Sequence, residues 1–172
     1  RARSVNEEGT RRLLEASRRA GVPRMIFVST VAASEGAPNY YARSKHAMEA
    51  VFDPVRDAIV RPGLIIGKDG HGLFQQLVDN LTGIGVVPLF GGGRQPLQTV
   101  HVDDVCEAIA RIVERNLAGA FNVAEPDPPS FAAFLRLLAE RLGVRARFVP
   151  LPFGPVLAAL RVIEALRLPF PL

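Results

Sequence analysis

Hydrophobic and polar positions alternate along the chain with two different periods. Residues 6–20 carry leucines and alanines on one side and arginines on the other, as an amphipathic helix does, and Gly21 and Pro23 end it. The stretch 24–30, RMIFVST, is a continuous apolar run that closes with hydroxyl groups, which is typical of a buried parallel strand. The pattern therefore predicts a helix followed by a buried strand.

The same succession of helix and strand continues to the end of the chain. Further strands are predicted in short pieces within 85–102, at 119–125, as an edge strand at 144–152, and at 57–67 with a break at Pro62 and Gly63. Further helices are predicted at about 40–52, 72–83, 104–116, 131–143 and 154–168. Strands that alternate with helices at this spacing favour an α/β fold, in which a parallel sheet has helices on both faces.

Composition places the chain among ordinary globular proteins. Its 172 residues are 48% hydrophobic and 22% charged, which is enough apolar material for a core of substantial size. The net charge of +4 comes from scattered arginines and there is no Trp, so nucleic acid is not a predicted partner. The single cysteine, Cys106, excludes an internal disulfide and fits a cytoplasmic protein. We expect its thiol to be buried, and we expect Asp103 or Asp104 to cap its helix.

The stretch NYYARSK, residues 39–45, puts Tyr41 one helical turn ahead of Lys45. A lysine ammonium in this place favours the phenolate form of the tyrosine, and it can also hold the hydroxyls of a ribose. A hydroxyl at the end of the preceding strand, on Thr30 or Ser29, would lie where ligands bind to parallel sheets. These groups suit hydride transfer beside a nicotinamide. The alternative is a tyrosine and a lysine that happen to share an exposed helix surface.

Further motifs flank this pair in a fixed order. They are Asn6 with Gly9 and Thr10, then Arg61 with Pro62 and Gly67, and finally His101 with Asp104 and Val105. Together with the Tyr-x-x-x-Lys pair, the series resembles the short-chain dehydrogenase/reductase superfamily in its extended and atypical branches, the NAD-dependent epimerase/dehydratase group. The likeness runs from residue 4 to about residue 150, which makes it far more specific than any single motif.

The resemblance implies a Rossmann-like, doubly wound parallel sheet with a small α+β substrate lobe. Residues 1–68 would be part of the NAD(P)-binding domain, and 69–172 the substrate-binding lobe, interleaved with the last Rossmann elements at about 98–125. The chain would be the C-terminal part of a longer polypeptide. The glycine-rich phosphate loop and the residue that separates NAD from NADP would lie upstream of residue 1, so the expected cofactor is NAD or NADP.

The resemblance also assigns roles to the candidate residues. Tyr41 would be the general acid/base and Lys45 its ribose-binding partner. Thr30, or in second place Ser29, would orient the substrate oxygen. The residues that would pass close to the nicotinamide are Pro62, Gly63 and Leu64.

Substrate contacts are less well defined by the sequence. Leu97 stands where sugar-nucleotide epimerases carry an arginine that grips the diphosphate. Arg94 lies nearby and could replace that arginine or be a solvated loop charge, and His71 is a second candidate for substrate contact. The three histidines show no spacing with Cys, Asp or Glu that is typical of metal ligands, so no metal site is predicted.

We therefore predict an NAD(P)-dependent oxidoreductase, epimerase or dehydratase that acts on a hydroxyl or carbonyl group of a small molecule, such as a sugar nucleotide or a sterol-like compound. The alternative is a catalytically idle NAD(P)-binding scaffold or assembly factor, similar to the accessory subunit of respiratory complex I. Members of the group often pair through the helices that correspond to 6–20 and 40–52, which makes a homodimer a candidate assembly. The helix at 154–168 is too short to span a bilayer; it could lie on a membrane surface, but we favour packing against the substrate lobe.

Overall fold

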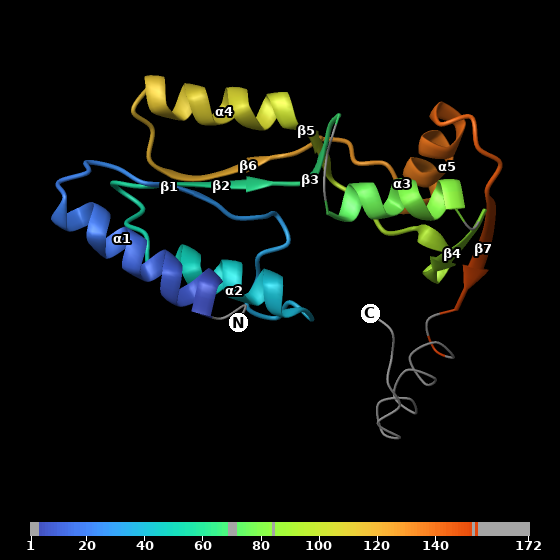
Figure 1. The fold of residues 1–172 in the computed structure, drawn as a ribbon, viewed down its shortest axis with the longest axis horizontal. Helices are drawn as coiled ribbons and strands as arrows, with labels where there is room; N and C mark the ends of the chain where they lie inside the picture. Colours follow the sequence, from blue (N-terminus) through green and yellow to red (C-terminus); the bar gives the residue numbers. More distant parts are fainter. Residues whose placement is uncertain (1–3, 69–71, 84, 153, 155–172) are drawn as a thin grey trace. The chain divides into compact units, whose positions relative to one another are not determined.

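The computed structural model describes residues 4–68, 72–83, 85–152 and 154, and it confirms an α/β fold with parallel strands (Figure 1). The chain divides into two compact units. Unit 1 comprises Arg1–Gly70 and Gln98–Asp127, and unit 2 comprises His71–Leu97 and Pro128–Leu172. The polypeptide thus returns to unit 1 once before it completes unit 2.

A three-stranded parallel sheet forms the centre of unit 1, with its strands in the order β1-β2-β6. The strands are β1 (Ile26–Val28), β2 (Ala58–Pro62) and β6 (Gly119–Val123). One face is covered by α1 (Thr10–Arg19), which follows the π-helical turn η1 (Ser4–Gly9), and by α2 (Tyr40–Glu49) (Figure 1). The other face is covered by α4 (Val102–Glu114). Because the strands are parallel, their carboxyl ends all lie at the same end of the sheet.

The chain changes partners after β2, as the predicted break at Pro62 and Gly63 implies. Beyond Gly63 it forms β3 (Leu64–Ile66), which pairs in parallel with β5 (Thr99–His101). Two hydrophobic clusters lie on the two faces of β2. One consists of Leu14, Phe52 and Ile59, and the other of Ala58, Val60 and Ile112. Successive residues of β2 are therefore buried on opposite faces, which explains the continuous apolar run in the sequence.

In its described part, unit 2 contains a two-stranded parallel sheet and two helices. Its elements are α3 (Leu73–Gly83), β4 (Val86–Phe90), the 3₁₀ turn η2 (Gly91–Gly93), α5 (Phe131–Arg141) and β7 (Arg147–Leu151). All three glycines of η2 have positive φ angles, which glycine adopts without strain. A Cβ on Gly93 would lie 2.8 Å from the Cβ of Ala132. The three glycines therefore form a tight structural turn against the start of α5.

Two predictions that concern α4 are wrong. His101 caps the helix instead of Asp103 or Asp104, because its Nδ1 accepts a hydrogen bond of 3.3 Å from the backbone N–H of Asp103. Cys106 is exposed instead of buried, since α4 turns Val105 and not its neighbour toward the sheet. Helical periodicity identifies faces, but it does not decide which of two apolar faces packs inward.

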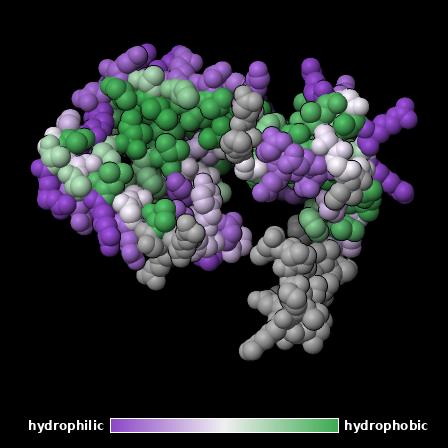
Figure 2. Space-filling model, viewed as in Figure 1, coloured by the Kyte–Doolittle hydropathy of each residue, from purple (hydrophilic) through white to green (hydrophobic). Residues whose placement is uncertain are grey.

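The outer side of β1 has no strand beside it within the described residues, because β1 pairs with β2 alone. Figure 2 shows a broad hydrophobic area on unit 1. Val28 at the end of β1 is 39% exposed. An unpaired strand edge with apolar surroundings is a place where a further strand can add.

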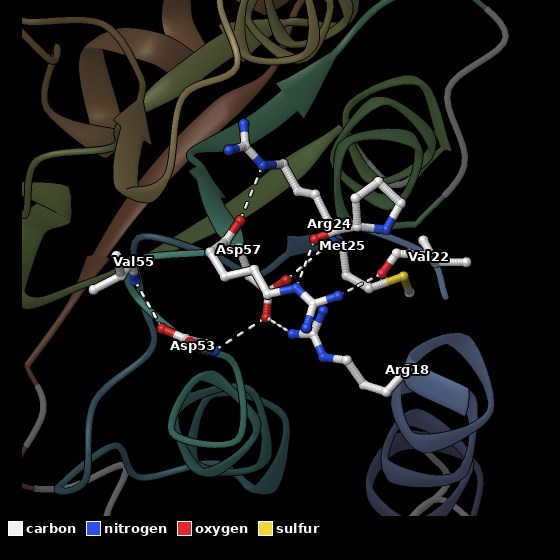
Figure 3. A network of polar contacts seen from close by, with 9 residues as sticks. Arg18, Val22, Arg24, Met25, Asp53, Val55 and Asp57 are labelled. Carbon is white, nitrogen blue, oxygen red and sulfur yellow. Dashed lines mark hydrogen bonds and ion pairs between the residues drawn. The ribbon is translucent and has the colours of Figure 1, made fainter. Parts of the chain in front are cut away.

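A buried carboxylate ties the amino ends of β1 and β2 to α1 (Figure 3). Asp57 directly precedes β2 and is 1% exposed. Its oxygens accept hydrogen bonds of 3.0 Å from the backbone N–H groups of Met25 and Asp53, and it pairs with the guanidinium of Arg18. This network lies at the amino ends of the strands, away from the end where Thr30 and Pro62 lie.

Candidate active site

Two hydroxyl groups follow β1 directly, and the structure gives them different surroundings. Ser29 is 2% exposed, and its Oγ donates a hydrogen bond of 2.5 Å to Oε1 of Glu49. Thr30 is half-buried, and its Oγ1 accepts from the backbone N–H of Ala32 at 3.3 Å. A hydroxyl that accepts in this way can still donate its proton to another oxygen. The structure therefore favours Thr30 over Ser29 as the hydroxyl that meets a substrate.

The start of α2 fixes where Tyr41 and Lys45 lie. Asn39 caps the helix, because its side-chain oxygen accepts a hydrogen bond of 2.8 Å from the backbone N–H of Ala42. Tyr41 is therefore in the first turn and Lys45 in the second, on the same side of the helix. The Lys45 Nζ lies 5.9 Å from the centroid of the Tyr41 ring. The Tyr41 side chain is 53% exposed, so a ligand can reach it.

Lys45 also joins α2 to the carboxyl end of β1. Its Nζ donates a hydrogen bond of 2.7 Å to the carbonyl oxygen of Val28 and lies 4.7 Å from the centroid of the Phe27 ring. Burial lowers the pKa of the Lys45 ammonium from its ordinary value of 10.5. An ammonium has three protons to donate, so the bond to Val28 leaves others for a ligand. The Tyr-x-x-x-Lys pair thus lies at the strand end that carries Thr30.

The three predicted cofactor residues lie where β2 passes into β3. The backbone N–H of Gly63 donates to the carbonyl oxygen of Val123 at 3.1 Å, and that of Leu64 donates to Gln98 at 2.7 Å. These two donors are therefore used within the fold. Any contact of Pro62, Gly63 or Leu64 with a nicotinamide would depend on packing rather than on these groups.

Gly63 has a packing reason to be glycine. A Cβ there would lie 2.5 Å from the backbone oxygen of Gln98 and 3.3 Å from the Cβ of Ala124. We expect Gly63→Ala to lower the free energy of unfolding by about 1–3 kcal/mol, because backbone atoms have to move. Gly36→Ala is the matched control, since a Cβ at Gly36 meets nothing within 4 Å. Urea unfolding measures both variants, and equal stabilities would contradict this account.

The two predicted substrate-binding residues belong to unit 2. Arg94 follows η2 and is exposed, and His71 lies outside the described residues, as does most of the helix predicted at 154–168. The roles of Arg94 and His71 remain predictions. Over the described ranges, no group of three or more His, Cys, Asp or Glu side chains is arranged to hold a metal ion. Within the same ranges, no helix has the length and apolar character needed to cross a membrane.

Comparison with protein families decides the affiliation of the chain. The model of the NAD dependent epimerase/dehydratase family matches residues 2–124, well over half of the sequence. The chain belongs to this family. The resemblance inferred from the ordered motifs is thereby confirmed.

Individual relatives of the family cover almost the whole chain. A ketoreductase of Stigmatella aurantiaca, named for its 4-hydroxy-2-methyl-3-oxo-4-farnesyl-3,4-dihydroquinoline-1-oxide substrate, is 30% identical over 94% of this chain and 55% of its own length. The mitochondrial subunit 9 of the NADH dehydrogenase (ubiquinone) 1 alpha subcomplex from Arabidopsis thaliana is 30% identical over 92% of this chain and 41% of its own length. The chain therefore spans about half the length of these curated relatives.

A solved structure of the family agrees with the fold. The UDP-glucose 4-epimerase of Thermus thermophilus, in complex with NAD, superimposes with a TM-score of 0.69 at 26% identity. The match covers 87% of this chain and 58% of that one. The arrangement of parallel strands and helices is thus shared with this solved epimerase.

Reasoning from the sequence missed Glu49, and it gave no role to Arg61. Glu49 lies one helical turn after Lys45, and its carboxylate is held by the guanidinium of Arg61, next to Pro62. A carboxylate beside the buried Met48 on a helix needs a cation or several donors. That requirement, together with the spacing of four from Lys45, is the signal that could have found this pair.

Proposed function

We propose that the full-length protein is an NAD(P)-dependent oxidoreductase that interconverts a carbonyl and an alcohol by hydride transfer. The observation that carries this proposal is the cluster at the carboxyl end of β1. There Lys45 bonds to Val28, the ring of Tyr41 lies beside the lysine ammonium, and Thr30 is two residues further along the chain. Membership of an NAD-dependent family supports the choice of cofactor.

Each residue of the cluster has a defined role in this proposal. A bound nicotinamide supplies or accepts the hydride. Tyr41 gives a proton to the carbonyl oxygen, and Thr30 donates a hydrogen bond to the same oxygen. The Lys45 ammonium stabilises the tyrosine as its proton leaves, and its remaining N–H groups hold the hydroxyls of the nicotinamide ribose.

The substrate in this proposal is an uncharged carbonyl compound rather than a sugar nucleotide. Leu97 occupies the place where a diphosphate-binding arginine is expected in sugar-nucleotide epimerases, and its backbone N–H already donates to Pro129 at 2.9 Å. The Stigmatella aurantiaca relative is a ketoreductase whose named substrate carries a farnesyl group. Both observations support reduction of a ketone without a diphosphate.

Binding of NADH and NADPH to the full-length protein tests the proposal. Lys45→Ala should weaken binding of the preferred nucleotide by about 10–100-fold, because a charge-assisted contact to the ribose is lost. Lys68→Ala is the matched control, since Lys68 is the other lysine of the chain and is exposed on the loop after β3. Fluorescence titration gives the dissociation constants. If the wild type binds neither nucleotide, the proposed function is wrong.

A nucleotide-binding scaffold is the second candidate function. It is supported by the 30% identity to a subunit named as part of an NADH dehydrogenase subcomplex. A scaffold would bind the nucleotide through Lys45 and yet tolerate loss of the Tyr41 hydroxyl. Turnover that depends on Tyr41 therefore separates the two functions.

A further inference from the structure

The carboxylate of Glu49 is the most highly connected buried group near the candidate site. The residue is 7% exposed. Arg61 holds it with two bonds, from Nε to Oε1 at 2.9 Å and from Nη2 to Oε2 at 2.5 Å. Ser29 Oγ adds a third bond to Oε1 at 2.5 Å. One carboxylate thus joins α2 to the ends of β1 and β2.

Each of the three joined residues is a short distance along the chain from a candidate site residue. Ser29 directly precedes Thr30, and Arg61 directly precedes Pro62. Glu49 follows Lys45 by one helical turn. A bidentate arginine bond restrains rotation as well as distance, so it fixes the orientation of α2 against the strand ends.

The electrostatics keep this carboxylate ionised. Burial by itself raises the pKa of Glu49, but the hydrogen bonds from Arg61 and Ser29 outweigh it, so the pKa lies below its ordinary value of 4.5. The hydrogen bond to Glu49 in turn raises the pKa of Arg61. Because Arg61 satisfies the carboxylate, Glu49 does not draw the ammonium of Lys45 away from Val28, although the two side chains are spaced four residues apart.

We propose that Glu49 is a positioning residue, whose bonds to Arg61 and Ser29 hold Lys45 in the orientation that binds the nicotinamide ribose. The inference rests on the proposed function, since the affinity that Glu49 would affect is that of the nucleotide bound by Lys45. It goes beyond stability, because it predicts a loss of cofactor affinity in protein that is fully folded.

The test compares two buried carboxylates at opposite ends of the same sheet in the full-length protein. Glu49→Gln removes the charge beside the candidate site. Asp57→Asn removes a comparable charge that is paired with Arg18 at the amino ends of the strands. Dissociation constants for NADH and NADPH and the emission spectrum of bound NADH are measured at a temperature where thermal unfolding shows every protein folded. Glu49→Gln should weaken binding of the preferred nucleotide about tenfold, which is the effect of one misplaced hydrogen bond. Asp57→Asn should leave the dissociation constant unchanged.

The possible outcomes separate this inference from the proposed function. Equal nucleotide affinity in wild type and Glu49→Gln would overturn it, as would an equal loss in Glu49→Gln and Asp57→Asn. If Glu49→Gln does not fold, Ser29→Ala is the second variant, because it removes one bond to the carboxylate without unpairing Arg61. The expected loss of nucleotide affinity is then about twofold to fivefold. In free energy this is about a third to two thirds of the tenfold effect. Unchanged affinity in Ser29→Ala would count against the inference. A wild type that binds neither nucleotide would instead refute the proposed function, and the positioning role with it.

Discussion

Replacing Tyr41 with phenylalanine is expected to lower kcat for carbonyl reduction by about 10²–10⁴-fold in the full-length protein. In the proposed mechanism the phenol is the proton donor; Tyr41 is exposed, and its ring lies 5.9 Å from the Lys45 ammonium. The substitution removes one oxygen and keeps the ring, so the affinity for NADH or NADPH should stay within about twofold of wild type. Oxidation of the preferred nucleotide with a panel of ketones identifies a substrate for the wild type and then measures the variant.

The neighbouring tyrosine is the matched control for this experiment. Tyr40 donates from its hydroxyl to the Glu7 carboxylate at 2.8 Å, so it joins α2 to η1 instead of facing a substrate. The kcat of Tyr40→Phe should therefore stay within about threefold of wild type, because the variant loses a hydrogen bond to Glu7 that contributes little free energy. Equal rates for wild type and Tyr41→Phe would refute the catalytic role and favour the scaffold.

Removing the Asp57 carboxylate is expected to destabilise the fold by about 2–4 kcal/mol. Asp57→Ala takes the acceptor from two backbone N–H groups and leaves the Arg18 guanidinium without its partner. The estimate is lower than for a fully buried pair, because the Arg18 side chain is 24% exposed. Urea unfolding gives the difference. Asp79→Ala is the control, since Asp79 is exposed on α3 and its loss should change stability by less than about 0.5 kcal/mol.

The effect of Asp57 should also depend on pH. Burial raises the pKa of this carboxyl, but the hydrogen bonds from Met25, Asp53 and Arg18 lower it more, so it lies below its ordinary value of 3.8. A group with a lowered pKa in the folded state stabilises the fold above its unfolded-state pKa and loses that contribution as the pH falls. The stability difference between wild type and Asp57→Ala should therefore be constant near neutral pH and shrink below about pH 4. A difference that grows in acid would contradict this assignment.

The fold was predictable from the sequence because local patterns decide its elements. The apolar run that ends at Thr30 contains the parallel strand β1, although the prediction that this strand is buried is wrong: its residues are half-buried or exposed, because β1 lies at the edge of the sheet within the described residues. Asn39 and Ser130 cap the helices that follow them. The proximity of Thr30, Tyr41 and Lys45 was predictable because strand ends and helical turns have fixed periods, so residues that are close in sequence have a known spatial relation. Their roles, and that of Ser29, stay predictions.

The remaining features depend on contacts between distant segments. Glu49 and Arg61 are 12 residues apart, and nothing local shows that they meet. The glycine at 63 is needed because the backbone of Gln98, just before β5, approaches it closely. His101 caps α4, although the sequence offers Asp103 and Asp104 as more common capping residues. The reason is that α4 begins directly after β5, so both aspartates already lie in its first turn. Periodicity and propensity carry no information on such encounters.

The interleaving of the two units has a consequence for how this protein can diversify. Strand β4 comes from the first segment of unit 2 and its hydrogen-bonded partner β7 from the second, and residues of unit 1 lie between them in the sequence. A chimera of two relatives made by a single crossover between β4 and β7 would combine a β4 from one parent with a β7 from the other. Recombination that is to preserve unit 2 has to exchange residues 71–97 and 128–172 together. Change at this part of the molecule is therefore expected to accumulate by point substitution rather than by shuffling of whole segments.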